Sequence, residues 1–260
     1  MSRHISAIAL VLGGALVCVG QSTQFSATLG TLRKYNTKEF AALTKQARSG
    51  DAVAQNALGM AYAFGAVVDR DDWQAVRWFV RAASRGSANA QNNLGVMYQQ
   101  GRGVQRDLAE AARRFRKAAE NGDLEGQYNY GEACLKGEGV PVNNDEAMKW
   151  LMVAAIKEHA GAQTDLGYMY ERGIGIEPDM AEASKWYRKA AEKGHAVAEH
   201  NLAVMYMLGR GMNQDLVEAL HWFRRASDHG YAPAQKAAEL LSEKVREEKT
   251  VAAGKAQGIR

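Results

Sequence analysis

Apolar residues recur along this chain at the three- and four-residue spacings of amphipathic helices, and the whole pattern returns every 36 residues. The clearest copy begins at Ala88. There Ala90, Leu94 and Met97 lie on one helical face. The pattern therefore predicts a helix over 88–100.

A second helix is predicted over 107–121 of the same copy, because Ala111, Phe115 and Ala118 again share one face. The G-x-G pair between the two helices is typical of turns with backbone conformations that residues with a Cβ resist. Each second helix opens with Asp or Asn, followed three residues later by Glu or Gln. This spacing predicts a capping box, in which the first side chain accepts from a free backbone N–H and the second bonds back to the cap. The pairs are Asp71 with Gln74, Asp107 with Glu110, Asn143 with Glu146, Asp179 with Glu182, and Asp215 with Glu218.

Five such helix pairs follow one another over 51–230 without insertion or deletion. We expect half-repeats to cap both ends, as helices over 36–50 and 231–249, with a flexible tail over 250–260. Because helices this short are marginal alone, their stability must come from stacking on neighbouring repeats. Only three prolines occur in the whole chain, and the expected fold class is all-α.

The pattern A-x-A-x-x-x-L-G-x-x-Y-x-x-G-x-G-V-x-x-D-x-x-x-A-x-x-W-x-x-x-A-A-x-x-G resembles the Sel1-like repeat, a slightly longer relative of the tetratricopeptide repeat. The resemblance implies a right-handed α-solenoid of five helix-turn-helix repeats with half-repeat caps. It also implies that the first helices line a concave surface and that the protein acts as an adaptor in protein assemblies. Exported bacterial members of similar size serve envelope signalling, polysaccharide export or motility. The disulfide cysteines of the family's cysteine-rich branch are absent here, so the penicillin-binding and weak β-lactamase properties of that branch are not expected.

The first residues of the chain follow a different pattern. A short basic start precedes an uncharged apolar run from Ile5 to Val19, and small residues follow it. This order is typical of a secretory signal peptide, and the run is shorter than the roughly 20 apolar residues of a spanning helix. We expect a signal peptide over 1–22, a linker over 23–35 and export, with the periplasm as the destination. An uncleaved leader that anchors the chain in the membrane is the alternative.

Composition narrows the function classes. The net charge of +4 is small and basic residues are interleaved with acidic ones, so nucleic-acid binding is not expected. No G-x-S-x-G, H-E-x-x-H or phosphate-loop motif occurs, and we expect no cofactor, metal or catalytic site. With the leader removed, Cys134 is the one remaining cysteine. It takes the place of a recurring tyrosine, which predicts a buried, inert thiol.

Repetition within the chain separates scaffold residues from candidates for function, because a residue type present in every copy is most simply structural. Four tryptophans at one position of the second helix are expected in the core: Trp78, Trp150, Trp186 and Trp222. Recurring amides are expected to bond backbone between repeats: Gln55, Gln91, Gln127, Gln163, Asn93, Asn129 and Asn201. His159 and His195 stand at the starts of first helices, where capping is a better expectation than metal binding.

The variable positions of the first helices are the main candidates for partner binding. In repeats two to four they form a polar and aromatic set: Asn92, Gln99, Glu125, Tyr128, Glu132, Lys136, Tyr168, Glu171 and Arg172. Repeats one and five are more apolar there, with residues such as Met60 and Val204. A groove with a polar middle and apolar ends suits an extended or helical peptide. An ordinary solvated face is the alternative.

A second candidate surface lies on the second helix of repeat three, at Met152, Val153 and Ile156. Repeats two, four and five place charged residues at these three positions. The change to apolar residues indicates a covered surface, which could contact a partner or a second copy of the chain. The alternative is that the linker or the tail folds over it.

These observations predict a non-catalytic protein–protein interaction scaffold in the cell envelope, with a protein or peptide partner and with no membrane contact except through an uncleaved leader. An envelope enzyme or glycan-binding protein that acts on peptidoglycan or β-lactams is the alternative function. An enzyme would need titratable groups converging in one pocket, which the scaffold does not. A purely structural spacer is a third possibility.

Overall fold

The structure, a computed structural model, describes residues 37–65 and 67–257. The predicted signal peptide and linker lie outside these residues. Over the described ranges the chain is all-α, as predicted, with twelve helices and no strand. In order, the helices are α3 (Thr37–Arg48), α4 (Ala52–Phe64), α5 (Asp72–Ser84), α6 (Ala88–Gln100), α7 (Leu108–Glu120), α8 (Leu124–Lys136), α9 (Asn144–Ile156), α10 (Ala160–Arg172), α11 (Met180–Glu192), α12 (Ala196–Leu208), α13 (Leu216–Asp228) and α14 (Ala232–Gln257).

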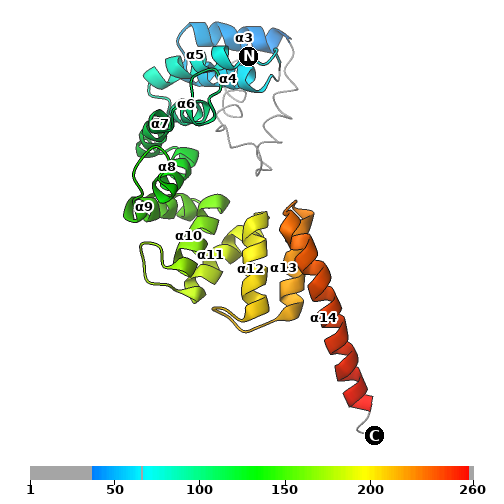
Figure 1. Ribbon diagram of the computed structural model, residues 1–260. Coiled ribbons are helices and arrows are strands. Elements are labelled where there is room, and N and C mark those ends of the chain that lie inside the picture. Colours follow the sequence, from blue (N-terminus) through cyan, green and yellow to red (C-terminus); the bar gives the residue numbers. More distant parts are fainter. Residues whose placement is uncertain (1–36, 66, 258–260) are drawn as a thin grey trace. The chain divides into compact units, whose positions relative to one another are not determined.

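The helices form the predicted solenoid of paired helices, in which first and second helices alternate from α4 onward (Figure 1). By their internal contacts, the described residues up to Trp150 form one compact part and those from Leu151 form another.

α14 continues to Gln257, where the sequence predicted a helix end near 249, and it extends well past α13 in Figure 1. None of the described helices has the length and apolar character needed to span a membrane.

Each first helix ends on a glycine in the left-handed conformation, as the G-x-G pair predicts. These glycines, at φ between 64° and 73°, are Gly65, Gly101, Gly137, Gly173 and Gly209. The second glycine of the pair has an additional reason. A Cβ on Gly103 would lie 2.2 Å from the carbonyl oxygen of Asp72, the first residue of the preceding repeat's second helix. The glycine therefore permits close contact between successive repeats.

The predicted capping boxes form only by half. The Asp or Asn side chain accepts from the backbone N–H three residues later, as in Asp107 with Glu110 at 2.9 Å. The N–H of Asp107 itself donates to the carbonyl oxygen of Tyr98 at 3.0 Å, and the other four repeats repeat this bond. Tyr98 lies in the last turn of α6, whose carbonyl groups have no partner within the helix. The bond closes the helix pair, and Glu110 pairs instead with Arg113 and Arg114.

The recurring glutamines bond backbone between repeats, as predicted. Each Nε2 donates to the carbonyl oxygen of an alanine eight residues earlier, near the end of the preceding second helix. The pairs are Gln55 with Ala47, Gln91 with Ala83, Gln127 with Ala119 and Gln163 with Ala155, at 3.0, 3.0, 3.4 and 3.0 Å. Each of these carbonyl groups also accepts the backbone N–H three residues later. The glutamine therefore adds a second hydrogen bond, and because its own amide is buried and needs a partner, this bond fixes how one repeat stacks on the one before it.

Two of the recurring asparagines make side-chain hydrogen bonds that the sequence did not predict. Asn93 Nδ2 donates to the side-chain oxygen of Asn56 at 2.9 Å, and Asn129 Nδ2 donates to that of Asn92 at 2.8 Å. The helical backbone around these residues is already hydrogen-bonded to itself, so the amides find each other across successive first helices.

The core lies between the two helices of each pair. A Cβ on Gly95 would lie 2.6 Å from the ring of Phe115, so the glycine allows the aromatic ring to pack directly on the α6 backbone. Three of the recurring tryptophans are buried as predicted: Trp78, Trp186 and Trp222. Trp150 is only half-buried, and its Nε1 donates to Glu146 at 2.6 Å.

Candidate functional site

The first-helix face of the N-terminal part is polar. On α8, Glu132 pairs with Lys136, whose side chain is half exposed, and Gln99 on α6 donates to Glu138 at 3.3 Å. Glu125 and Tyr128 are half-buried on the same α8. These residues form a hydrogen-bonded polar surface at the positions predicted for partner binding.

Two residues assigned to this face by sequence are not accessible there. Asn92 is completely buried and accepts from Asn129, so the prediction that it contacts a partner was wrong. Met60, expected to make the end of the groove apolar, is also completely buried. Both positions vary between repeats although their side chains are buried, so variation alone does not separate a packing position from a binding position.

In the C-terminal part, Tyr168 and Arg172 lie one turn apart on α10 and are both exposed. The Tyr168 side chain is 43% exposed, and the Arg172 guanidinium carbon lies 5.8 Å from the centre of its ring. Glu171 has an internal role, because it accepts from the buried Tyr187 hydroxyl at 2.9 Å. Burial, together with this carboxylate, raises the pKa of Tyr187 well above its ordinary value. The α10 side chains available to a partner are therefore Tyr168 and Arg172.

The apolar set on the second helix of repeat three is partly exposed. Ile156 is 69% exposed, whereas Met152 and Val153 are half-buried. In repeats four and five, the position of Val153 holds Lys189 and Arg225, which lie 4.0 and 4.7 Å over the ring of the recurring tryptophan. Repeat three has thus lost a cation–π contact at this position and gained an apolar side chain.

Cys134 is buried, as predicted. Burial raises the pKa of its thiol, and the neighbouring Tyr130 hydroxyl is hydrogen-bonded to it. Burial likewise raises the pKa of Tyr130, to about 12. A thiol that resists ionisation is a poor nucleophile, so this site has no activated cysteine.

The two histidines at first-helix starts differ. His159 caps α10 as predicted, since its Nδ1 accepts from the Ala162 N–H at 3.1 Å. His195 makes no cap bond, contrary to the prediction, and its Nδ1 lies 2.9 Å from Thr164 Oγ1. Burial, with a smaller effect of the nearby His159, lowers the pKa of His195 to about 4. Burial also lowers the pKa of His200.

Repeat five contains a buried carboxylate that the sequence reasoning missed. Glu199 occupies the position of the recurring glutamine and is completely buried. Its oxygens lie 3.0 Å from the Arg225 guanidinium and 2.7 Å from His229 Nδ1. Arg225 also donates to the carbonyl oxygen of Ala191 at 3.3 Å, the acceptor that a glutamine would have used. The break in the glutamine series was the signal that could have revealed this exchange.

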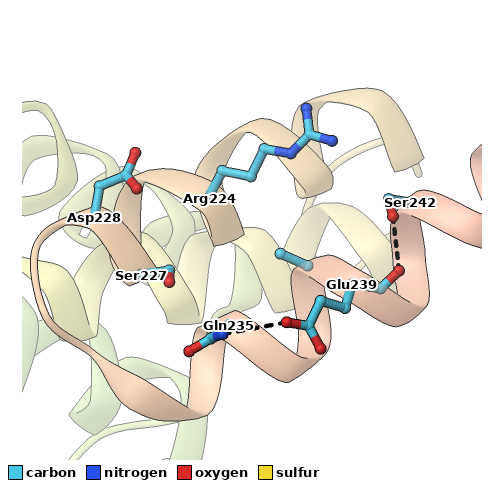
Figure 2. A pocket seen from close by; sticks show the side chains of 7 residues that line it. Arg224, Ser227, Asp228, Gln235, Glu239 and Ser242 are labelled. Carbon is cyan, nitrogen blue, oxygen red and sulfur yellow. Dashed lines mark hydrogen bonds between the residues drawn. The ribbon is translucent and has the colours of Figure 1, made fainter.

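The described residues offer little for metal or catalytic chemistry. They contain no group of three or more His, Cys, Asp or Glu placed to hold a metal ion. A shallow cleft between α13 and α14 is lined by Ala238 and by polar residues, none of which is His or Cys (Figure 2). In it, Gln235 points toward Glu239 and donates to it at 3.2 Å, so that carboxylate already has a partner.

Comparison with known proteins identifies the repeats. The family model described as Sel1 repeat matches residues 52–87, 88–123, 124–157, 160–195 and 196–231. Among solved structures, the chain is similar to a Sel1 repeat protein from Oxalobacter formigenes, with a TM-score of 0.76 and 31% identity over 81% of this chain and 83% of that one. It is also similar to a protective antigen of uropathogenic Escherichia coli strains that displays an SLR fold. That match has a TM-score of 0.75 and 32% identity, and covers 93% of this chain but about half (51%) of the antigen. No curated protein matches the chain.

In the cluster of Glu199, Arg225 and His229, we expect replacement of the carboxylate to be tolerated and replacement of the arginine to be destabilising. Glu199→Gln restores the donor found in the other repeats, and Arg225 and His229 are exposed enough to be hydrated. We expect the free energy of unfolding to change by less than about 1 kcal/mol. Arg225→Ala leaves the carboxylate buried and short of a partner, and should cost roughly 3 kcal/mol or more.

The matched control is the double variant. Arg225→Ala should cost much less in the Glu199→Gln background, because no buried charge then remains. Urea unfolding followed by circular dichroism measures all four proteins. If Arg225→Ala lowered the free energy of unfolding equally in both backgrounds, the destabilisation would not come from an unpaired Glu199 carboxylate.

The depressed pKa of His195 predicts acid sensitivity of the C-terminal part. The ordinary pKa of 6.5 applies to the unfolded chain, while the folded value is about 4, so the unfolded chain binds the proton first. Stability is therefore complete above pH 6.5 and falls as the pH drops toward 4, by up to about 3 kcal/mol. His200 acts in the same direction.

His195→Ser tests this, because repeat two has Ser87 at the same position. Urea unfolding between pH 7 and pH 4 should show a smaller loss of stability in the variant than in the wild type. Identical pH profiles would contradict the assignment to His195.

Proposed function

The chain belongs to the Sel1 repeat family, and from that membership we propose that it is a non-catalytic scaffold of the cell envelope that binds a protein or peptide on its first-helix face. Sel1 repeat proteins generally serve as protein-interaction scaffolds. The proposal adds the compartment and the surface to that general role.

The pair Tyr168 and Arg172 carries the proposal. The recurring residues of the repeats are occupied with one another, as the glutamine and asparagine bonds show, whereas this pair is exposed on α10. Tyrosine and arginine are enriched among the residues that dominate binding energy, because both combine contact area with directional hydrogen bonds. The further contacts we assign to a partner are Gln99, Glu125, Tyr128, Glu132 and Lys136, whereas Glu171 is left out because it accepts from the buried Tyr187 hydroxyl.

We assign a second contact to the apolar set of Met152, Val153 and Ile156. Isoleucine exposed to 69% at a position that carries charge in other repeats is costly unless a partner or a second copy covers it.

The alternative, an enzyme or glycan-binding protein acting on peptidoglycan or β-lactams, has less support. An enzyme needs titratable groups that converge on one pocket. In the described part of the chain, Cys134 is buried with a raised thiol pKa, His159 caps a helix and His229 pairs with Glu199. These groups are each engaged in a structural contact, so we propose no catalytic residue and no cofactor.

A photoreactive residue in place of Tyr168 tests the first-helix surface in the cells that export the protein. We expect a protein or peptide adduct. Once that partner is identified, Tyr168→Ala and Arg172→Ala should each weaken its binding about tenfold. The same photoreactive residue at exposed Lys117, on a second helix, is the control and should not give this adduct. Recovery of glycan alone would contradict the proposal.

The repeat-three contact is tested by replacing Met152, Val153 and Ile156 with Arg, Lys and Glu, the residues of repeat two. The fold should be retained, because repeat two carries this set on the same helix face. Oligomeric state by light scattering and partner binding are then compared with wild type. If both are unchanged, the apolar set is not a contact surface.

A further inference from the structure

The chain has a fifth tryptophan that does not follow the repeat. Trp73 lies near the start of α5, where the other repeats place Ala109, Asp145, Ala181 and Val217. Its side chain is 56% exposed, in contrast to the buried Trp78 of the same helix. None of the stacking contacts described above requires an indole at this position, and exposed apolar residues are informative where they form a patch with their neighbours.

Trp73 belongs to a surface with two arginines and a valine. The Arg77 guanidinium carbon lies 4.5 Å over the Trp73 ring, and that of Arg81 lies 4.5 Å over Trp78. Val80, one turn beyond Arg77, is 46% exposed. Trp73, Arg77, Val80 and Arg81 follow helical spacing and share one side of α5, which we name the α5 outer face.

The charge of the α5 outer face is unbalanced, unlike that of α7. On α7, Arg113 occupies the position of Arg77 and pairs with Glu110. α5 has the uncharged Gln74 in place of Glu110, and among the described residues neither Arg77 nor Arg81 has an ion-pair partner. Asp72, the only carboxylate of α5, is bound by Arg70 and Arg102. The face therefore presents two cations beside two exposed apolar side chains.

We propose that the α5 outer face docks an acidic protein segment that carries a large apolar side chain. The apolar group packs on Trp73 and Val80, and flanking carboxylates bind Arg77 and Arg81. A guanidinium stacked on an indole keeps its N–H edge available, and that edge matches a carboxylate with two parallel hydrogen bonds. Tryptophan and arginine are also the side chains most enriched among those that dominate binding energy.

An anionic membrane fits this face less well than an acidic protein segment. Recognition of anionic lipids by charge uses clusters of about 4–8 cations, and each contributes only about 1 kcal/mol. The α5 outer face has two, each already oriented by an indole, which favours discrete carboxylates over a diffuse negative surface. This surface is on a second helix, so the inference stands apart from the first-helix surface proposed above.

The test uses random peptides displayed on phage, selected on the full chain. Trp73→Ala is the matched variant, because repeats two and four carry alanine at this position and fold, and Arg77→Glu reverses one charge. Circular dichroism melting confirms that both variants are folded. We expect a class of peptides that loses binding about tenfold or more with either variant, and whose sequences combine Asp or Glu with a large apolar residue.

Peptides affected by Tyr168→Ala but not by Trp73→Ala report on the first-helix face, so failure of one surface does not imply failure of the other. The absence of any Trp73-dependent class would overturn the inference, as would a Trp73-dependent class without acidic residues. Phosphatidylglycerol vesicles are the second probe. Vesicle binding that is lost in Trp73→Ala, without acidic peptides, would assign the face to a membrane and overturn the inference.

Discussion

Stacking of each repeat on the one before it is the constraint on which the rest of the structure depends. The repeat helices are 13 residues long, and helices of this length are marginal in water on their own. Two contacts recur where successive repeats meet: the glutamine of a first helix on the carbonyl of the preceding second helix, and the second glycine of the turn against the start of that helix. The glutamine supplies a hydrogen bond, and the glycine lacks the Cβ that would clash with the preceding second helix. Both residues recur at a fixed spacing along the chain.

The same constraint explains which features the sequence could predict. Helix pairs, left-handed glycines, cap side chains and glutamine bonds were all predictable, because each recurs in most or all copies at one fixed period. The asparagine pairs and the second half of the cap were not, since they depend on which of several nearby groups lies closer in three dimensions. The Asp107 N–H could have bonded Glu110, and only the fold shows that the carbonyl of Tyr98 is there instead.

Candidate binding residues were predicted with less success, and for a physical reason. A position that differs between repeats is either exposed on the surface or packed inside the protein, and periodicity does not distinguish the two. Asn92 belongs to the second kind and Tyr168 to the first. Exceptions within an otherwise regular series were more informative than variable positions. Glu199 in the glutamine series and Trp73 outside the tryptophan series are both such exceptions, and both mark local changes of charge.

The exchange at Glu199 has a consequence for how chains of this kind can evolve. The groups that accommodate the carboxylate, Arg225 and His229, lie within the same repeat, and the acceptor outside it is the backbone carbonyl of Ala191, at a position where repeats one to three also have alanine. A gene duplication that copied residues 196–231 would therefore carry the charged variant together with its compensation and could place it behind any other repeat. One duplication of this repeat would thus both add a repeat to the solenoid and add a buried charged cluster to its interior.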